Sequence, residues 1–269
     1  MTNPALPSGT SLREEVVAAV AAIRAAPQSP APRIALFQLA AVLGDWERAR
    51  AQLETLAALD PEFTSLARVY GGLIASERVR GRVFVGTERA RVLGEPSPWL
   101  LLMVEALWLE GRRGAAGEAQ ALRAQALRDA AARPGQIGTE EFTWIMDADP
   151  RLGPTLEVVV EDHYQWLALD RVRELRAEAP RALRDLVWQP ATILLAGGAE
   201  VQAYLPVRYP GSEAEEADAV RLARETRWTG AAGCQRGLGQ RVLATDRGDH
   251  ALLDIRSLRL DQDAENRDA

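Results

Sequence analysis

The sequence has no lysine, a single cysteine and two histidines, and these shortages exclude several kinds of site. With Cys234 alone, no intramolecular disulfide can form and no cysteine-based zinc or iron–sulfur site is possible. His163 and His250 lie far apart in the sequence, without metal-ligand spacing around them. The sequence therefore favours a protein of a reducing compartment, the cytoplasm, with no metal and no cofactor.

Long apolar runs and runs of one charge are also missing. The longest apolar run, 99–104, is far shorter than the roughly 20 residues that a membrane-spanning helix needs. The first eleven residues lack the basic and apolar parts of a signal peptide. The 32 basic residues, all arginine, are interleaved with 38 acidic residues, and the net charge is −6. We therefore expect a soluble cytoplasmic protein that binds neither nucleic acid nor a membrane.

The 269 residues fall into two parts that differ in composition. From 11 to 133, apolar residues recur at the three- and four-residue spacings of amphipathic helices. From 140 to 260, Val- and Ile-containing runs separated by Gly-Gly, Pro-Gly and Arg-Gly turns predict short strands. We predict an α+β protein of two domains that meet near Pro134. An all-helical domain, 11–133, precedes a smaller α+β domain, 140–260, rich in antiparallel hairpins, and an acidic tail, 261–269, is expected to fray.

A 34-residue spacing in the helical part is similar to that of the tetratricopeptide repeat. Pro27 and Pro61 are 34 positions apart, and Gly44, Trp46 and Ala49 stand where that repeat has its turn, an aromatic residue and the helix crossing. Helical hairpins of this kind stack side by side and leave a concave face. The expected helices are 12–26, 33–43, 46–59, 63–79, 98–110 and 115–132.

Turn signals in the second part predict three hairpins and two short helices. The expected hairpins pair 156–160 with 164–167, 191–196 with 200–205, and 240–245 with 251–255. The expected short helices are 170–174 and 217–225.

Asp147 and Asp149 form the segment that looks most like a catalytic site. Two carboxylates at this spacing hold a divalent metal in some transferases, but no nucleotide-binding βαβ unit precedes them. Asp149 stands before Pro150, a pair that starts turns, and Arg151 is placed to pair with either carboxylate. We favour a capped turn. The alternative is a metal-dependent enzyme that uses Asp147, Asp149 and Glu213.

The segment 98–109 is apolar on nearly all sides. This pattern predicts a central helix buried among its neighbours. The alternative is that Trp99, Met103 and Trp108 line a groove for an amphipathic partner helix, because tryptophan is enriched among interface hot spots.

Several segments occur in a recognisable order. In the second part they are WIMDADPRLGPTLE (144–157), DLVWQP (185–190), RYPGSE (208–213), GLGQRVLATD (237–246) and LLDIR (252–256), and in the helical part they are 37–49 and 92–99. This order resembles the ImpE family, also called SciE or TagJ, the accessory proteins of bacterial type VI secretion. The resemblance covers roughly residues 11 to 258.

The resemblance implies a non-enzymatic cytoplasmic protein without catalytic residues. Members of this family bind the small (TssB-like) subunit of the contractile sheath through its N-terminal helix, and are thought to influence how the ClpV ATPase handles the sheath. We expect this chain to bind that helix directly, and to affect sheath assembly or ClpV-dependent recycling. A general tetratricopeptide-type scaffold that binds another peptide is a second alternative to the metal-dependent enzyme.

The motif residues themselves predict structural and recognition roles. Those singled out are Trp144, Asp147, Asp149, Arg151, Trp188, Arg208, Tyr209, Glu213 and Gln240. The two tryptophans are expected to be apolar anchors that pack the β-rich part or seal it against the helices. A buried polar network with two-point arginine–carboxylate pairing is expected among Arg208, Glu213, Asp147 and Arg151.

Overall fold

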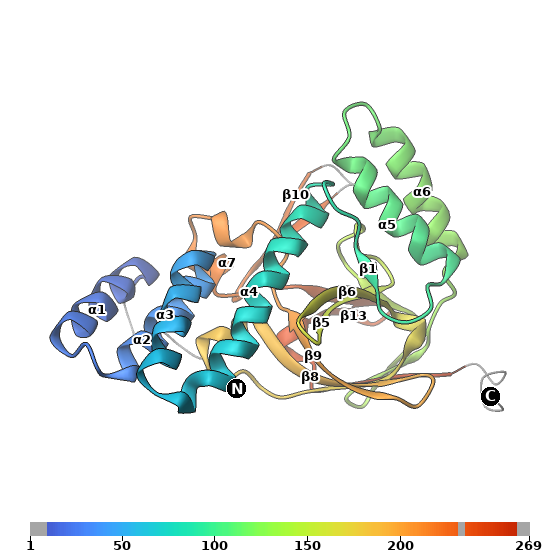
Figure 1. Ribbon diagram of the computed structural model, residues 1–269. Helices are drawn as coiled ribbons and strands as arrows, with labels where there is room; N and C mark the ends of the chain where they lie inside the picture. The colour runs from blue at the N-terminus through green and yellow to red at the C-terminus, as the bar shows by residue number, and fades with distance from the viewer. Residues whose placement is uncertain (1–9, 231–234, 263–269) are drawn as a thin grey trace.

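The computed structural model describes residues 10–230 and 235–262. Helices fill the first part of the chain and strands fill most of the second (Figure 1), so the predicted α+β class is confirmed. The two-domain division and the likeness of the helices to tetratricopeptide repeats stay predictions. Cys234 and residues 263–269 of the expected tail lie outside the described residues.

Local chemistry sets where the helices begin. They are α1 (Leu12–Ala25), α2 (Pro30–Val42), α3 (Trp46–Leu59), α4 (Thr64–Phe84), α5 (Pro98–Glu110) and α6 (Ala116–Asp129), with a 3-10 turn, η1 (Pro61–Phe63). Ser11 and Glu14 form a capping box at α1, and Asp45 caps α3. α4 continues past the expected end at 79, because Arg80 and Val83 in its last turns are buried. Among the described helices, none is long and apolar enough to cross a bilayer.

The main sheet has nine strands in the described residues. In spatial order they are β1 (Arg91–Val92), β6 (His163–Ala168), β5 (Thr155–Val160), β9 (Glu200–Pro206), β8 (Trp188–Leu195), β7 (Val172–Ala177), β14 (Ser257–Leu260), β2 (Gly135–Ile137) and β3 (Glu140–Phe142). Every neighbouring pair is antiparallel except β1 and β6. The sequence predicted an all-helical region at 11–133. The short strand β1 lies between α4 and α5, so this region is not wholly helical.

Smaller elements complete the second part. They are the sheet of β13 (Gly248–Ala251), β12 (Val242–Thr245) and β4 (Ile145–Asp147), the hairpin of β10 (Thr226–Thr229) and β11 (Arg236–Gly239), the helix α7 (Asp218–Arg221), and the 3-10 turns η2 (Leu169–Arg171), η3 (Leu183–Leu186), η4 (Ser212–Ala214) and η5 (Leu252–Asp254).

Some predicted elements are correct and others are wrong. The hairpins β5–β6 and β8–β9 are confirmed. The third hairpin pairs β12 with β13. Its second strand therefore covers 248–251 and not the predicted 251–255. The short helix predicted at 170–174 is wrong, since Val172 and Leu175 are buried in strand β7. Asp261, at the start of the tail expected to fray, donates its N–H to the Pro134 carbonyl at 3.0 Å.

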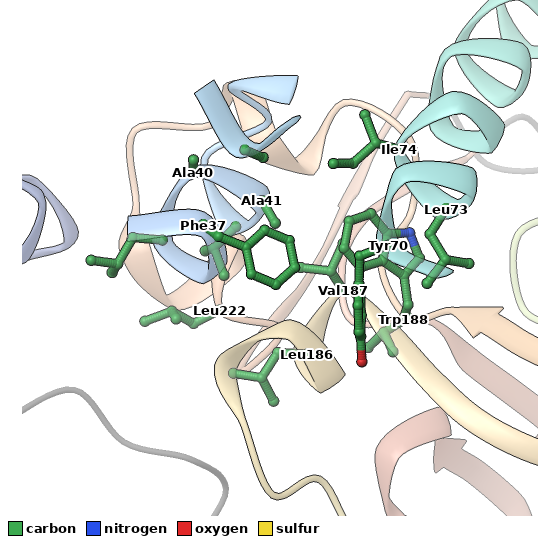
Figure 2. Packing of buried hydrophobic residues seen from close by; sticks show 14 of the residues in the cluster. Phe37, Ala40, Ala41, Tyr70, Leu73, Ile74, Leu186, Val187, Trp188 and Leu222 are labelled. Carbon is green, nitrogen blue, oxygen red and sulfur yellow. The ribbon is translucent and has the colours of Figure 1, made fainter. Parts of the chain in front are cut away.

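Three buried apolar clusters hold these elements together. One lies within the β-rich part, from Phe142 to Leu260. A second joins α1 to α4 with Val187 and Trp188 of the β-rich part, and Figure 2 shows Phe37 and Tyr70 facing these two residues. The third joins α4, α5 and α6 with residues of β6. The helices therefore share two of their buried clusters with the β-rich part.

Candidate functional site

The turn after β4 organises the carboxylates that the sequence singled out. The Asp147 carboxylate accepts the Asp149 N–H at 2.8 Å, and the Asp149 carboxylate accepts the Arg151 N–H at 2.9 Å. The Arg151 guanidinium then forks onto Asp149, with Nε–Oδ1 at 2.9 Å and Nη2–Oδ2 at 2.6 Å. Gly237 of β11 adds an N–H to Asp149 Oδ2 at 3.0 Å. The segment is thus a capped turn.

Arg241 ties this turn to the sheet. Its Nε and Nη2 lie 3.0 and 2.8 Å from Asp147 Oδ2, and its Nη1 lies 3.3 Å from Glu157 Oε2. The Tyr209 hydroxyl donates to the other Asp147 oxygen at 2.8 Å. Arg241, Glu157 and Tyr209 are all 0% exposed, so these contacts form away from water. Low local polarity makes each bond stronger and makes any unpaired group costly.

Glu157, the charged residue of strand β5, connects the same group to helix α4. Arg80 of α4 donates two hydrogen bonds to the Glu157 carboxylate, Nε–Oε1 at 2.7 Å and Nη2–Oε2 at 2.9 Å. The Tyr164 hydroxyl of β6 donates to Glu157 Oε1 at 2.6 Å. Trp166 Nε1 in turn donates to the Tyr164 hydroxyl at 2.6 Å. Helix α4 is therefore fixed to the sheet by charge-assisted bonds as well as by apolar packing.

We call this set the ionic cluster: Arg80, Asp147, Asp149, Arg151, Glu157 and Arg241. It balances three guanidinium groups against three carboxylates, and none of its members is more than 7% exposed. Sequence reasoning missed Arg80, Glu157 and Arg241 as site residues. The signal that could have found Glu157 is its place as the charged residue in the strand TLEVVV.

Burial and charge move the pKa values of Asp147 and Glu157 in opposite directions. Burial raises the pKa of Asp147 from 3.8 to about 6, although Arg241 pulls it down. Burial would also raise the pKa of Glu157, but Arg80 and Arg241 together hold it below its ordinary value. Both carboxylates are therefore ionised at neutral pH, and Asp147 is the one that takes up a proton first on acidification.

Asp147 predicts a specific pH dependence of stability. Its pKa is higher in the folded protein (about 6) than the ordinary value of 3.8, so the folded state binds more protons in this window. The stabilisation from its protonation is fully present below pH about 4 and is lost as the pH rises through 6. Urea unfolding at pH 4 to 7 will show the wild type gaining stability relative to Asp147→Asn as the pH falls from 6 to 4. An unchanged difference across this range would contradict the assignment.

The hydrogen bonds of the Arg208 side chain go to backbone carbonyls and not to the expected carboxylates. Arg208 donates to the backbone carbonyls of Val42 at 2.6 Å and Arg221 at 2.7 Å, at the C-terminal ends of α2 and α7. Its charge therefore caps two helices, a favourable position for a cation, and its burial lowers its pKa to about 10. Glu213 lies beside Gly44 in the α2–α3 turn, where a Cβ on Gly44 would come within 2.6 Å of its Cγ.

Gln240 bridges two turns of the β-rich part. Its side-chain amide donates to the Ala223 carbonyl at 2.6 Å and accepts the Leu253 N–H at 3.0 Å. Its backbone forms an isolated bridge with Arg208. Gln240 therefore fixes the connection between β11 and β12, which carries Arg241, and this is a positioning role.

The two motif tryptophans lie in different surroundings. Trp188 is 0% exposed, and its ring centroid lies 5.8 Å from Trp46 and 6.0 Å from Tyr70. Its Nε1 donates to Glu77 of α4 at 3.0 Å, so Trp188 joins the sheet to α3 and α4 (Figure 2). Trp144 is only half-buried. An anchoring position between helices and sheet is therefore observed for Trp188.

The apolar helix α5 adopts the buried arrangement rather than the groove. Trp99 is 6% exposed and Met103 is 1% exposed, both within the cluster shared with β6. Neither side chain is free to line an open groove, because both are already covered by the chain's own residues. Trp108 is half-buried and lies between the guanidinium groups of Arg89 and Arg112, 3.6 and 4.0 Å from its ring centroid.

A groove is present elsewhere, between α3 and α4. We call it the α3–α4 groove, lined by Arg50, Leu53, Glu54, Ala67, Arg68, Gly71, Ile74, Ala75 and Arg78. Leu53 and Ile74, each 1% exposed, form an apolar floor. Ala67, Gly71 and Ala75 recur every four residues and so share one face of α4. Small side chains on that face leave room for the close approach of another helix.

Alanine substitutions at two adjacent glycines of α4 are expected to change the free energy of unfolding in opposite directions. A Cβ on Gly71 would meet nothing within 4 Å, whereas a Cβ on Gly72 would lie 2.2 Å from Asp162 Oδ1. Gly71→Ala will therefore raise the free energy of unfolding by about 0.5–1 kcal/mol through helix propensity. Gly72→Ala will lower it by about 1–2 kcal/mol through overpacking. Thermal unfolding of both variants checks this, and equal shifts of the same sign would contradict the packing described.

The carboxylates of the Asp147–Asp149 turn are already engaged by other groups of the chain. The Asp147 and Asp149 carboxylates already accept bonds from arginine, tyrosine and backbone donors. Glu213 lies at the α2–α3 turn instead of beside them. Across residues 10–230 and 235–262, His, Cys, Asp and Glu nowhere form a group of three or more that could hold a metal ion. The arrangement holds helix α4 to the sheet.

Comparison with known proteins gives a consistent result. The ImpE protein family matches residues 139–259. The type VI secretion system accessory component TagJ of Pseudomonas aeruginosa is 43% identical over 238 residues, which cover 88% of this chain and 83% of that protein. The crystal structure of protein VPA1032 from Vibrio parahaemolyticus, 23% identical, has the same fold, with a TM-score of 0.84 over 94% of this chain and 95% of that one. These findings support an accessory role in type VI secretion, and the chain belongs to the ImpE family.

Proposed function

We propose that the chain is a non-enzymatic cytoplasmic adaptor of type VI secretion that holds the N-terminal helix of the small (TssB-like) sheath subunit in the α3–α4 groove. Through that contact it modulates sheath assembly or ClpV-dependent recycling. The 43% identical relative named as an accessory component supports the process. The observation that supports the place is the groove itself, with its apolar floor and small-residue face.

The groove fits an amphipathic helix by shape. Apolar side chains at positions i, i+3 or i+4, and i+7 of a bound helix would pack over Leu53 and Ile74. The residues between them would lie against Ala67, Gly71 and Ala75, where no large side chain stands in the way. Burial of a few such apolar groups supplies the affinity, at roughly 25 cal/mol per Å² of apolar surface removed from water.

The rim of the groove favours an acidic partner. Arg50 pairs with Glu54 at 2.7 Å, and Arg78 pairs with Glu47. Arg68 is exposed and makes no ion pair with any other described residue. A carboxylate of the bound helix placed beside Arg68 would therefore set its register and speed its association.

The enzymatic alternative has little support from the site. A metal-dependent reaction needs carboxylate oxygens that face an open cavity. Asp149 is 0% exposed and forks with Arg151, and Asp147 is 1% exposed and faces Arg241. Opening a coordination position would mean breaking these buried pairs, which is strongly unfavourable.

Copurification with the small sheath subunit tests the proposed function. The full chain should retain the intact subunit and lose it when the first helix of that subunit is deleted. A subunit carrying the same residues in scrambled order in that helix is the matched control and should not be retained. Equal retention of the intact and deleted subunits would overturn helix capture. Retention of the scrambled helix would favour the general peptide-binding scaffold instead.

A further inference from the structure

A second concave site lies at the N-terminal end of α6. It is a pocket of about 290 Å³ bounded by the first turns of α6, the turn after β4 and the start of β11. Glu110, the last residue of α5, also lines it, and Figure 1 shows α5 and α6 side by side. Its charged lining comes from Glu110, Arg123, Arg151 and Arg236. The proposed function uses none of these residues.

Helix α6 points its N-terminal end into this pocket. Ala116 and Gly117, its first two residues, are part of the lining. The residue at the cap position is Ala115, and no side chain in the described part of the protein caps the helix. The first N–H groups of a helix have no partner within the helix, and together with the helix dipole they attract an anion. α6 has 14 residues, long enough for this effect.

Arg123 supplies the second, independent indication. It lines the pocket and is only 8% exposed, yet its Nε has no hydrogen-bond partner among residues 10–230 and 235–262. Its Nη2 pairs with Glu110, and Arg236 Nη2 lies 3.3 Å from the other oxygen of that carboxylate. A buried N–H without a partner is unfavourable, so an acceptor that reaches Arg123 Nε is favoured there.

The charge around the pocket is positive. Arg123, Arg151 and Arg236 contribute three positive charges, and Glu110 together with Asp149, the partner of Arg151, contributes two negative ones. The planar fork of each guanidinium suits an oxyanion. We propose that this pocket binds a tetrahedral oxyanion of the phosphate class, held by Arg123, Arg236 and the first N–H groups of α6. Glu110 is the internal counter-ion with which the oxyanion competes.

Titration of the full chain with inorganic phosphate at constant ionic strength tests this site, with heat of binding as the readout and chloride as the blank. Binding should saturate in the millimolar range or below. Arg236→Gln should weaken it about tenfold, the loss of one charge-assisted contact. Glu110→Gln should strengthen it, because the competitor is gone. Arg176→Gln is the matched control, since Arg176 is also half-exposed and paired with a carboxylate, and it should change nothing.

The results of the phosphate titration that would support the site differ from those that would overturn it. Phosphate binding that Arg236→Gln weakens and Arg176→Gln leaves intact supports the site. The absence of saturable binding up to 50 mM phosphate, or equal binding by Arg236→Gln and wild type, overturns it. A parallel titration with phosphoserine distinguishes a free ion from a phosphate monoester on a protein, since only the monoester requires space beyond the four oxygens. Arg236 is exposed, so its variant is expected to fold.

Discussion

Replacing Arg241 with methionine will lower the free energy of unfolding by about 3–5 kcal/mol. Arg241 is 0% exposed and lies between the carboxylates of Asp147 and Glu157, at 2.8 and 3.3 Å. Without it, Asp147 keeps only Tyr209 and a backbone N–H, and a buried negative charge is left without its cation. Urea unfolding at pH 7 measures the loss. We expect the substitution to remove the ion pairs of Arg241 with Asp147 and Glu157 and to keep most of the packing of its aliphatic stem.

A surface arginine serves as the matched control for this prediction. Arg176 pairs with Glu200 at 2.8 Å, a distance like that of the buried pair, but both side chains are about half exposed. Arg176→Met should therefore cost less than about 1 kcal/mol. Adding Asp147→Leu to Arg241→Met should recover part of the loss, because the orphaned charge is removed as well. Equal costs for the two single substitutions would contradict a stabilising role for the ionic cluster.

Filling the α3–α4 groove will abolish capture of the sheath helix. Gly71→Trp places a large side chain where a Cβ meets nothing within 4 Å, so the substitution should leave the fold intact. It should weaken binding of the helix by about 100-fold or more, the size of effect seen at the centre of interfaces. Isothermal titration with a peptide of the subunit's first helix measures this loss.

The control for the groove prediction is a tryptophan elsewhere on a helix surface. Ala124 is exposed on α6, away from the α3–α4 groove. Ala124→Trp should bind the peptide as the wild type does. A loss of affinity in both variants would indicate a non-specific effect of surface tryptophan. Undiminished binding of the peptide by Gly71→Trp would show that the helix does not bind in the α3–α4 groove.

The parts of the site that could be predicted from the sequence are local. The turn that joins Asp147, Asp149 and Arg151 depends on contacts two residues apart, and Asp before Pro signals it. Partners distant in sequence left no such signal. Arg80 and Glu157 are 77 residues apart, and Arg208 reaches Val42 across 166 residues, so only the assembled fold brings them together.

Helix α5 shows why burial was harder to predict than helicity. A segment that is apolar all round is helical whether its neighbours or a partner cover it. Trp99 and Met103 turned out to be covered by the chain's own residues, whereas the open groove lies on α3 and α4, whose outward faces read as ordinary alanine-rich surface. A short strand inside the helical part, β1, was also unpredictable, because its two residues carry no periodicity.

The central claim is that an amphipathic helix of the small sheath subunit binds between α3 and α4. Backbone amide chemical shifts, recorded while that helix is titrated into the full chain, test it most directly. We expect saturable shifts concentrated in α3 and α4, around Leu53, Arg68 and Gly71. Saturable shifts concentrated in α5 and α6 or along the sheet, or no saturation at high micromolar peptide, would contradict it.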